Sequence, residues 1–290
     1  MNMRAGSIAR RQTSQRAAFG LLTAVTTIVV IVVLSIIVIM IISGGEAISW
    51  DFLTQAPSQA GKAGGIFPAI VGTFYLMLGT IIFALPIGVM AGIYLTEYAR
   101  DNWLTRLINL AIVNLAGVPS IVYGLFGLGI FVLAFNFGIS LLSASLTLAC
   151  QALAMTITTS REAVLAVPKE YREGSLATGA TKWQTVWHVV LPQARPGIIT
   201  GAVLAMSRAA GETAPILVVG AAFLLPSLPN SPFDQFMALP YHLYTVAAHV
   251  PGIPDSTMWG VALVLLAVVL SFNVLATIIR LRARQRRYST

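Results

Sequence analysis

Six long apolar segments constrain what this chain can fold into. They lie near residues 17–42, 67–95, 107–135, 139–160, 197–225 and 257–280. A helix needs about 20 mostly apolar residues to cross a bilayer at roughly 1.5 Å per residue, and each segment is that long. The composition agrees, because 57% of the residues are hydrophobic and only 10% are charged, outside the range of soluble domains. We therefore expect an all-α integral membrane protein with six transmembrane helices.

The positive charges predict the orientation of these helices. If both ends of the chain are cytoplasmic, sixteen of the eighteen Lys and Arg residues fall in cytoplasmic segments; Lys62 falls outside and Arg208 within a span. Positive residues are retained on the cytoplasmic side, so we expect a multi-pass protein of the bacterial inner membrane with both termini cytoplasmic. Topology then accounts for the net charge of +8, with membrane lipids as partners and without nucleic-acid binding.

The expected organisation along the chain is simple. Residues 1–16 form a basic cytoplasmic tail, 17–42 the first transmembrane helix, 43–66 a flexible periplasmic loop, 67–281 a membrane core and 282–290 a second basic cytoplasmic tail. The first apolar run is longer than the roughly 7 to 15 residues of a secretory signal peptide, so we expect it to stay attached. A single cysteine, Cys150, allows no disulfide within the chain.

Glycine and proline interrupt three of the predicted spans, at residues 86–88, 117–120 and 215. Proline removes a backbone donor and kinks a helix, and in lipid the freed carbonyl must be satisfied by protein or by water in a cavity. Such breaks suit helices that line a path. Tight helix packing is the better explanation for any single break, since Gly and Pro are common in membrane helices.

Arg208 and Glu212 give the strongest chemical signal within a predicted span. Arg208 lies about 16 Å beyond Gly197 along a helix, and Glu212 follows at a spacing that allows an ion pair. Gly197, Gly201 and Ala205 share their helix face. An Arg within a membrane normally marks a functional path, and its guanidinium matches the oxygens of phosphate or carboxylate. We assign both residues to the path of an anion; a structural ion pair, within the helix or with a partner subunit, is the alternative.

One long polar interruption, residues 161–196, separates the apolar segments. Pro168 suits the first turn of a helix, and Gly179 can supply a turn that bulkier residues rarely adopt. A second helix from about Thr181 is expected to end by Leu191, because Pro192 blocks its continuation. A water-facing helix, hinge and helix on the cytoplasmic side of a membrane protein indicates a docking surface for another protein.

The spacing within this segment resembles the EAA loop of ABC importer permeases, whose pattern is E-A-A-x3-G-x9-I-x-L-P. Here Gly174 and Ser175 stand for the two alanines and Val189 for the isoleucine. The resemblance implies that the loop couples the chain to an ATPase. The residues that carry it are Glu173, Gly174, Ser175, Gly179, Val189, Leu191 and Pro192.

Further segments narrow the resemblance to the PstA family of phosphate-importer permeases. They are residues 64–73, 117–124, 179–185 and 208–215. The resemblance implies a type I, MetI-like permease core that pairs with a PstC-like permease as a heterodimer. Two copies of a PstB-like ATPase would bind from the cytoplasm, and a periplasmic PstS-like protein would deliver phosphate. Phosphate would then enter by alternating access.

The sequence itself has no nucleotide-binding loop of the form G-x4-G-K-[ST]. We therefore expect no enzyme activity, no cofactor and no metal on this chain, with ATP and Mg on the partner ATPase. Arg208 by itself would also accept sulfate or phosphonate, so an importer of another oxyanion is one alternative. An ATP-independent anion channel or transporter is a second, although it has no reason to carry the loop at 161–196.

The outer segment at residues 226–256 is rich in proline and contains two histidines, His242 and His249. We expect a short amphipathic helix near residues 232–250. Two histidines without a nearby carboxylate are a weak indication of a metal site, so we expect both to be surface residues. Contact with a binding protein or a cover over the pore are both compatible with this segment.

Overall fold

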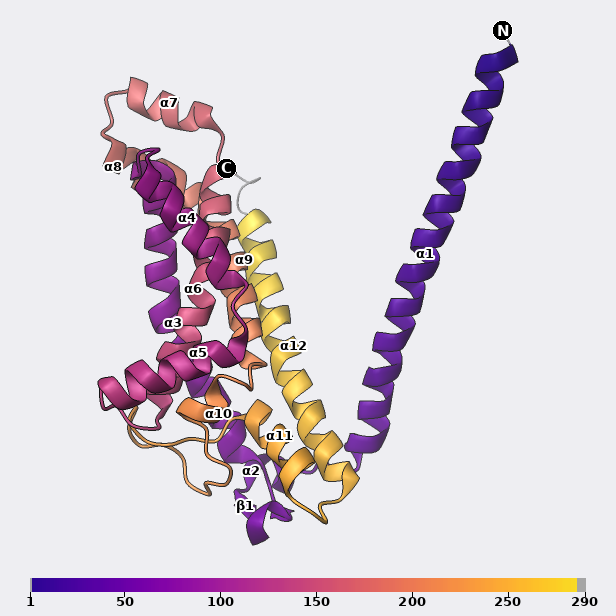
Figure 1. The fold of residues 1–290 in the computed structure, drawn as a ribbon, viewed down its shortest axis with the longest axis vertical. Helices are drawn as coiled ribbons and strands as arrows, with labels where there is room; N and C mark the ends of the chain where they lie inside the picture. The colour runs from indigo at the N-terminus through magenta and orange to yellow at the C-terminus, as the bar shows by residue number, and fades with distance from the viewer. Residues whose placement is uncertain (1, 286–290) are drawn as a thin grey trace.

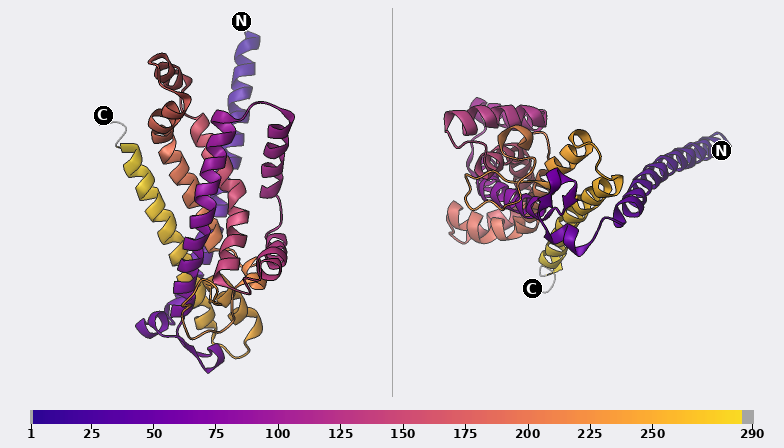
Figure 2. Two further views of the ribbon diagram at one scale, coloured as in Figure 1. Left: turned by 90° about the vertical axis from the view of Figure 1, so that its left-hand side faces the viewer. Right: turned by 90° about the horizontal axis from the view of Figure 1, so that it is seen from below.

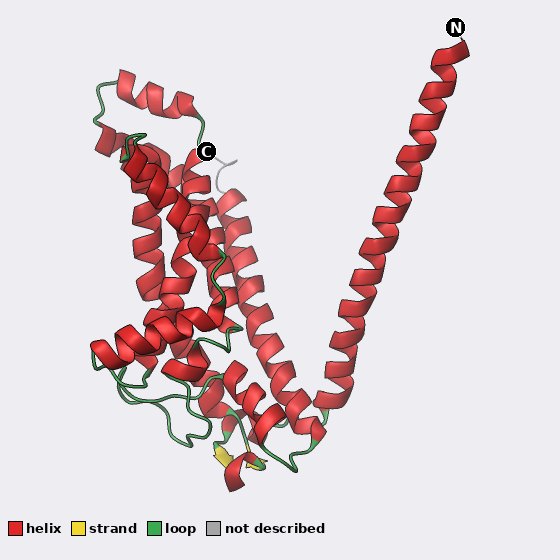
Figure 3. Cartoon of the chain, in the orientation of Figure 1, coloured by secondary structure: helices red, strands yellow, loops and turns green. Residues whose placement is uncertain are grey.

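The computed structural model describes residues 2–285, which are mostly helical (Figures 1 and 3). Within those residues, five helices are long and apolar enough to cross a membrane, and a bent pair makes six when it is counted as one span. The expectation of an all-α protein with six spans is thus confirmed. The spans are built on α1 (Asn2–Gly45), α3 (Phe67–Ile93), α4 (Trp103–Ala116) with α5 (Ser120–Gly127), α6 (Leu141–Leu165), α9 (Leu191–Ala210) and α12 (Asp255–Gln285).

Helix α1 stands apart from the other spans. It runs unbroken from Asn2, so the basic residues expected as a tail at 1–16 continue the same helix. Its end packs against the start of α12, where a Cβ on Gly44 would lie 2.6 Å from the Trp259 carbonyl. From that contact α1 leans away from the bundle (Figures 1 and 2). None of its most apolar window is buried within the chain, as suits a lipid-facing surface.

Small residues let α3, α6 and α9 pack closely. On α3, a Cβ added to Gly88 would lie 2.6 Å from the Thr156 side chain of α6, and one added to Gly92 would lie 2.8 Å from Ser160. Pro86 lies inside α3 without ending it. Gly88 therefore serves helix packing, as expected for a single break, whereas Pro86 is exposed.

The third span is broken, as the sequence predicts. α4 and α5 meet at an angle of 106° across residues 117–119, and α5 lies across the bundle (Figure 1). A π-helical segment, η3 (Leu128–Ala134), continues α5. The Tyr123 hydroxyl donates to the Leu115 carbonyl at 2.8 Å and so bridges the bend.

The fifth span differs from the prediction of 197–225 and a helix end at Leu191. α8 (Lys182–Thr185), the π-helical segment η4 (Val186–Val190) and α9 form one continuous helical run that ends at Ala210. Pro192 does not stop it. A wider π-helical turn, in which the Leu191 N donates to the Val186 carbonyl, directly precedes this proline.

The cytoplasmic-side connection expected at 161–196 contains a separate short helix, α7 (Lys169–Ala177), before this run. A further π-helical segment, η2 (Tyr94–Tyr98), extends α3 at the same end of the bundle. Side chains from η2, α8 and η4 line an apolar groove there, among them Tyr94, Tyr98, Trp183 and Trp187.

At the opposite end, the segment at 43–66 is more ordered than the flexible loop we expected. It contains α2 (Trp50–Thr54), the 3₁₀ turn η1 (Gln59–Gly61) and the antiparallel pair β1 (Pro57–Ser58) and β2 (Ala63–Gly64). Phe52 and Ile66 are buried in a cluster with Leu239 and Val261. Apolar side chains therefore anchor this segment to the bundle.

The outer segment is also folded onto the bundle. α10 (Ile216–Val219) follows the break at Pro215, and α11 (Leu239–His249) forms only the second half of the helix expected at 232–250. His242 on α11 is 3% exposed, so the expectation of a surface histidine is wrong for this residue. Burial lowers the pKa of His242 to about 4, partly opposed by a hydrogen bond with the Phe223 backbone. His249 is exposed.

Candidate substrate path and coupling loop

Arg208 and Glu212 lie where α9 ends. Arg208 is in the last turn of the helix, and Glu212 follows the capping residue Gly211. The Arg208 Nε lies 3.4 Å from the Glu212 Oε1, so the two residues pair within the chain. Ser207 Oγ donates at 2.5 Å to Asn273 Oδ1 of α12, which fixes the same turn against a second helix.

Gln151 completes this group, and sequence reasoning missed it. Its Nε2 donates to the Glu212 Oε1 at 2.6 Å from a position near the middle of α6. The Gln151 Oε1 is buried and has no hydrogen-bond partner among the described residues. A polar side chain in an apolar span was the available signal, since such residues hydrogen-bond across helices. The pair at 208 and 212 therefore lies level with the middle of a membrane-spanning helix.

A small cavity of about 20 Å³ opens beside these three side chains, between α6 and α9. Arg208 is 57% exposed and Glu212 is 16% exposed. The distance of 3.4 Å is long for a charge-assisted hydrogen bond, and within residues 2–285 Arg208 makes no other hydrogen bond or ion pair. Donors of the guanidinium are thus left free for an anion. The walls are otherwise apolar, with Leu148, Met155 and Ala205 among them.

The small residues that share the helix face with Arg208 have a different role. A Cβ on Gly197 would lie 2.6 Å from the Ala163 side chain, and one on Gly201 would overlap Thr159. Ala205 is buried. This part of α9 therefore packs directly on α6, and the face opens into the cavity only near Arg208 and Glu212.

The candidate coupling residues on α7 face solvent. Not one of the nine residues of α7 is buried, and the helix projects beyond the end of the bundle (Figure 1). Glu173 and Gly174 are exposed. Ser175 is half-buried because its Oγ lies 2.9 Å from the Thr185 Oγ1, a hydrogen bond that joins α7 to α8. This surface is available to another protein.

Gly179 forms the hinge between α7 and α8. Its φ is +86°, which L side chains rarely adopt, and open space surrounds the position of an added Cβ. Glycine is therefore needed here because of the backbone conformation, and not because a side chain would lack space. Thr181 then begins α8 with a capping box: its Oγ1 accepts from the Gln184 N at 3.3 Å, and its own N donates to Gln184 Oε1 at 2.8 Å.

The last three coupling residues lie on the helical run and connect the loop to the bundle. Val189 is half-buried in η4, Pro192 is exposed at the start of α9, and Leu191 packs against a buried cluster. That cluster contains Val164, Val167, Val190, Ala194 and Ile198. One half of the coupling loop is thus exposed, and the other half is anchored in apolar contacts.

Solved structures of transporters resemble this fold. A chain of the MetNI methionine ABC transporter in an inward facing conformation matches with a TM-score of 0.61 at 20% identity, over 75% of this chain and 97% of that one. A chain of a bacterial alginate ABC transporter matches with a TM-score of 0.65 at 13% identity, over 88% and 92%. These likenesses confirm the MetI-like permease fold.

Sequence relatives cover most of the chain. The probable ABC transporter permease protein YqgI of Bacillus subtilis is 34% identical over 248 residues, which is 81% of this chain and 84% of that protein. The phosphate transport system permease protein PstA 1 of Mycobacterium tuberculosis is 36% identical over 227 residues, 78% of this chain and 72% of that protein. Residues 84–285 match the family described as binding-protein-dependent transport system inner membrane component. The chain belongs to this family of transporter membrane subunits.

Proposed function

We propose that this chain is the transmembrane permease subunit of an ATP-driven importer, through which inorganic phosphate enters the cell by alternating access. The observation that supports phosphate as the substrate is the set of relatives named as phosphate transport permeases. Besides the mycobacterial protein, the probable phosphate transport system permease PstA of Methanocaldococcus jannaschii is 35% identical over 73% of this chain. Both bacterial and archaeal relatives of this name thus match at similar identity.

The chemistry of the cavity supports an anion as the substrate. Arg208 stays charged at any relevant pH and offers a planar fork of donors that fits phosphate oxygens. Glu212 lowers the net charge beside it, and Gln151 holds the carboxylate in place at 2.6 Å. A transit site must release its anion as well as bind it. A lone Arg in an apolar cavity would bind too tightly, and the shared carboxylate weakens that binding.

The exposed α7 and the hinge at Gly179 support docking of a partner ATPase, where ATP and Mg would bind. We propose two copies of a PstB-like ATPase, a PstC-like permease as the second half of the membrane path, and a PstS-like binding protein outside. The phosphate transport system permease protein PstC of Pasteurella multocida is also a relative, 33% identical over 77% of each chain. Two related permeases can therefore build one path.

Location in the inner membrane with both termini cytoplasmic is part of the proposal. Its support is the distribution of positive charge along the sequence. In addition, the start of α1, the exposed α7 and the end of α12 all lie at one end of the molecule (Figure 1). Part of the expected basic tail, residues 286–290, lies outside the described residues.

Reconstitution tests the proposed function. The assembled importer in liposomes, with its binding protein, should take up radiolabelled phosphate only when ATP is supplied. Uptake that persists without ATP would favour the channel or secondary transporter. Excess unlabelled sulfate or a phosphonate that competes as well as phosphate would favour an importer of another oxyanion. A binding protein loaded with phosphate should stimulate ATP hydrolysis, because the substrate must be delivered before the ATPase closes.

A substitution at the hinge tests the coupling loop. Gly179→Val forces a strained φ of +86° and should redirect α7, so that ATP hydrolysis continues while uptake falls. Gly138→Val is the matched control, since Gly138 also has positive φ, +69°, and open space around it but lies at the far end of the bundle. Equal loss of coupling in both variants would mean that general strain, and not the loop, is responsible.

A further inference from the structure

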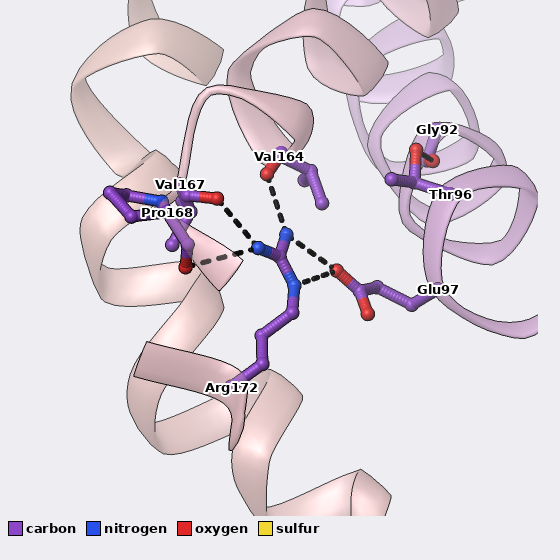
Figure 4. A network of polar contacts seen from close by, with 7 residues as sticks. All are labelled: Gly92, Thr96, Glu97, Val164, Val167, Pro168 and Arg172. Atoms are coloured by element: carbon purple, nitrogen blue, oxygen red, sulfur yellow. Dashed lines mark hydrogen bonds and ion pairs between the residues drawn. The ribbon is translucent and has the colours of Figure 1, made fainter. Parts of the chain in front are cut away.

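None of the residues of helix α7 is buried, and among the described residues two of its side chains, Arg172 and Ser175, make polar contacts outside the helix. The Ser175 hydroxyl bonds to buried Thr185 at the end of α8, on the same side as the hinge at Gly179. A second contact is needed to join α7 directly to α3 and α6. Arg172 makes this contact (Figure 4).

The Arg172 guanidinium uses all three of its nitrogens. Nε and Nη2 each donate to the Glu97 Oε1 at 2.9 Å. Nη1 donates to the Val167 carbonyl at 2.6 Å, and Nη2 also donates to the Val164 carbonyl at 2.8 Å. A longer contact of 3.4 Å reaches the Pro168 carbonyl. The side chain therefore spans from α7 to two other elements (Figure 4).

Each of these partners is suited to a cation. Val164 lies in the last turn of α6 and Val167 two residues beyond its end, where the helix dipole favours positive charge. Glu97 lies on η2, the π-helical extension of α3, and π-helical turns are frequent at functional sites. The side chains of Arg172 and Glu97 are only 18% and 10% exposed. Three elements thus meet at one enclosed ion pair.

We propose that Arg172 is the positioning residue that transmits movement of α7 to α3 and α6. When a partner ATPase pulls on α7, the contact with Glu97 carries the displacement into the end of α3, and the carbonyl contacts carry it into α6. α6 in turn holds Gln151 beside Glu212. This inference rests on the proposed function, because it assigns a force-bearing contact within that transport cycle.

The Arg172–Glu97 contact resists separation because both charged groups are mostly enclosed. If the two side chains move apart, each charge loses its partner while it has little access to water, which is costly in free energy. The two donors on one carboxylate oxygen also fix the angle of the guanidinium. A flexible contact would instead let α7 pivot about Gly179 and the bend near Pro168. Stiffness at this point converts a pull on the loop into motion of the bundle.

A double-mutant cycle tests the proposal in the assembled importer. Arg172→Gln, Glu97→Gln and the double variant are reconstituted, and phosphate uptake and ATP hydrolysis are measured on the same vesicles. We expect each single variant to lower phosphate moved per ATP about tenfold, a typical coupling energy, while hydrolysis continues. The double variant should be no worse than either single one. Arg106→Gln is the control, because Arg106 pairs with Asp101 in full exposure on another helix and should leave the ratio unchanged.

Several outcomes would overturn this role. Wild-type phosphate per ATP in Arg172→Gln, or losses that add in the double variant, would show that the pair does not act as a unit. If uptake, hydrolysis and co-purification of the ATPase all fall together, the contact is structural only. Failure of the wild-type importer to show ATP-dependent uptake would instead contradict the proposed function itself, so the two failures are distinguishable.

Discussion

Two Arg–Glu ion pairs among residues 2–285 differ in burial and in hydrogen bonding. Arg172 and Glu97 are enclosed, and two bonds of 2.9 Å plus carbonyl contacts satisfy the guanidinium. Arg208 and Glu212 share one contact of 3.4 Å beside a cavity, and Arg208 is 57% exposed. The same two residue types therefore make a fixed joint in one place and an open site in the other. The number of satisfied donors, and not the presence of an ion pair, is what distinguishes the roles that we propose for the two pairs.

Removal of the Arg208 charge should have the largest effect on phosphate uptake. Arg208→Gln leaves the packing face of α9 intact but removes the donors that face the cavity, so phosphate uptake should fall about 1,000-fold, equivalent to about 4 kcal/mol. The measurement is uptake by the reconstituted importer, with co-purified ATPase as a check on assembly. Arg106→Gln serves again as the control. Substantial uptake in the Arg208 variant would remove this residue from the path.

His242 can be compared with the two Arg–Glu pairs, because it is a buried titratable group with no ion pair among the described residues. Its pKa is lowered to about 4 by burial, below an unfolded value of about 6.5. The unfolded chain therefore binds a proton first, and stability should fall as pH drops from about 6.5 to about 4, by up to about 3 kcal/mol. Below that range the loss should stop.

Thermal unfolding of the purified chain at several pH values measures this loss. His242→Asn should flatten the dependence, whereas His249→Gln should not, since His249 is exposed. An unchanged pH profile in the His242 variant would mean that other groups dominate the acid sensitivity.

Glu212→Gln should alter release more than binding. The substitution keeps a side chain that can contact Gln151 but removes the charge that weakens anion binding. We expect the KM for phosphate-loaded binding protein to stay equal or fall and kcat for uptake to fall about tenfold, the signature of an over-stabilised bound state. A raised KM with unchanged kcat would show that Glu212 helps to bind the anion.

Gln151→Leu should have the smallest effect. It removes the 2.6 Å bond to Glu212 without removing either charge. Uptake should fall about threefold, or about 0.7 kcal/mol, near the lower end of the net contribution of one hydrogen bond. Met155→Leu, another substitution in the same cavity wall, is the matched control. An effect as large as that of Arg208→Gln would place Gln151 itself in contact with the anion.

The sequence predicted those features that depend on local pattern. Length and hydropathy were sufficient for the number of spans, and the Gly and Pro residues at 117–119 for the broken span. The spacing of Arg208 and Glu212 allowed an ion pair within the chain but did not distinguish it from a pair with a partner subunit. The hinge at Gly179 followed from the same reasoning, since a polar loop needs one residue that tolerates positive φ.

Contacts between distant residues were not predictable in this way. Gln151 and Glu212 are 61 positions apart, and Arg172 and Glu97 are 75 apart, so no local period relates them. Burial of His242 was missed for a similar reason, because the residues that cover it come from separate segments around an irregular outer loop. Pro192 was misjudged because a π-helical turn cannot be recognised from composition.

That π-helical turn, η4, also sets a phase relationship along the fifth span. A turn with i to i+5 hydrogen bonds holds about one residue more than an α-helical turn. Loss of one residue between 186 and 190 would restore a regular helix and rotate everything before it by about 100° relative to α9. Either the loop or Arg208 would then face the wrong neighbour. The number of residues between Thr181 and Arg208 is therefore under tighter constraint than most of their identities, and single insertions or deletions there should be far less tolerated than substitutions.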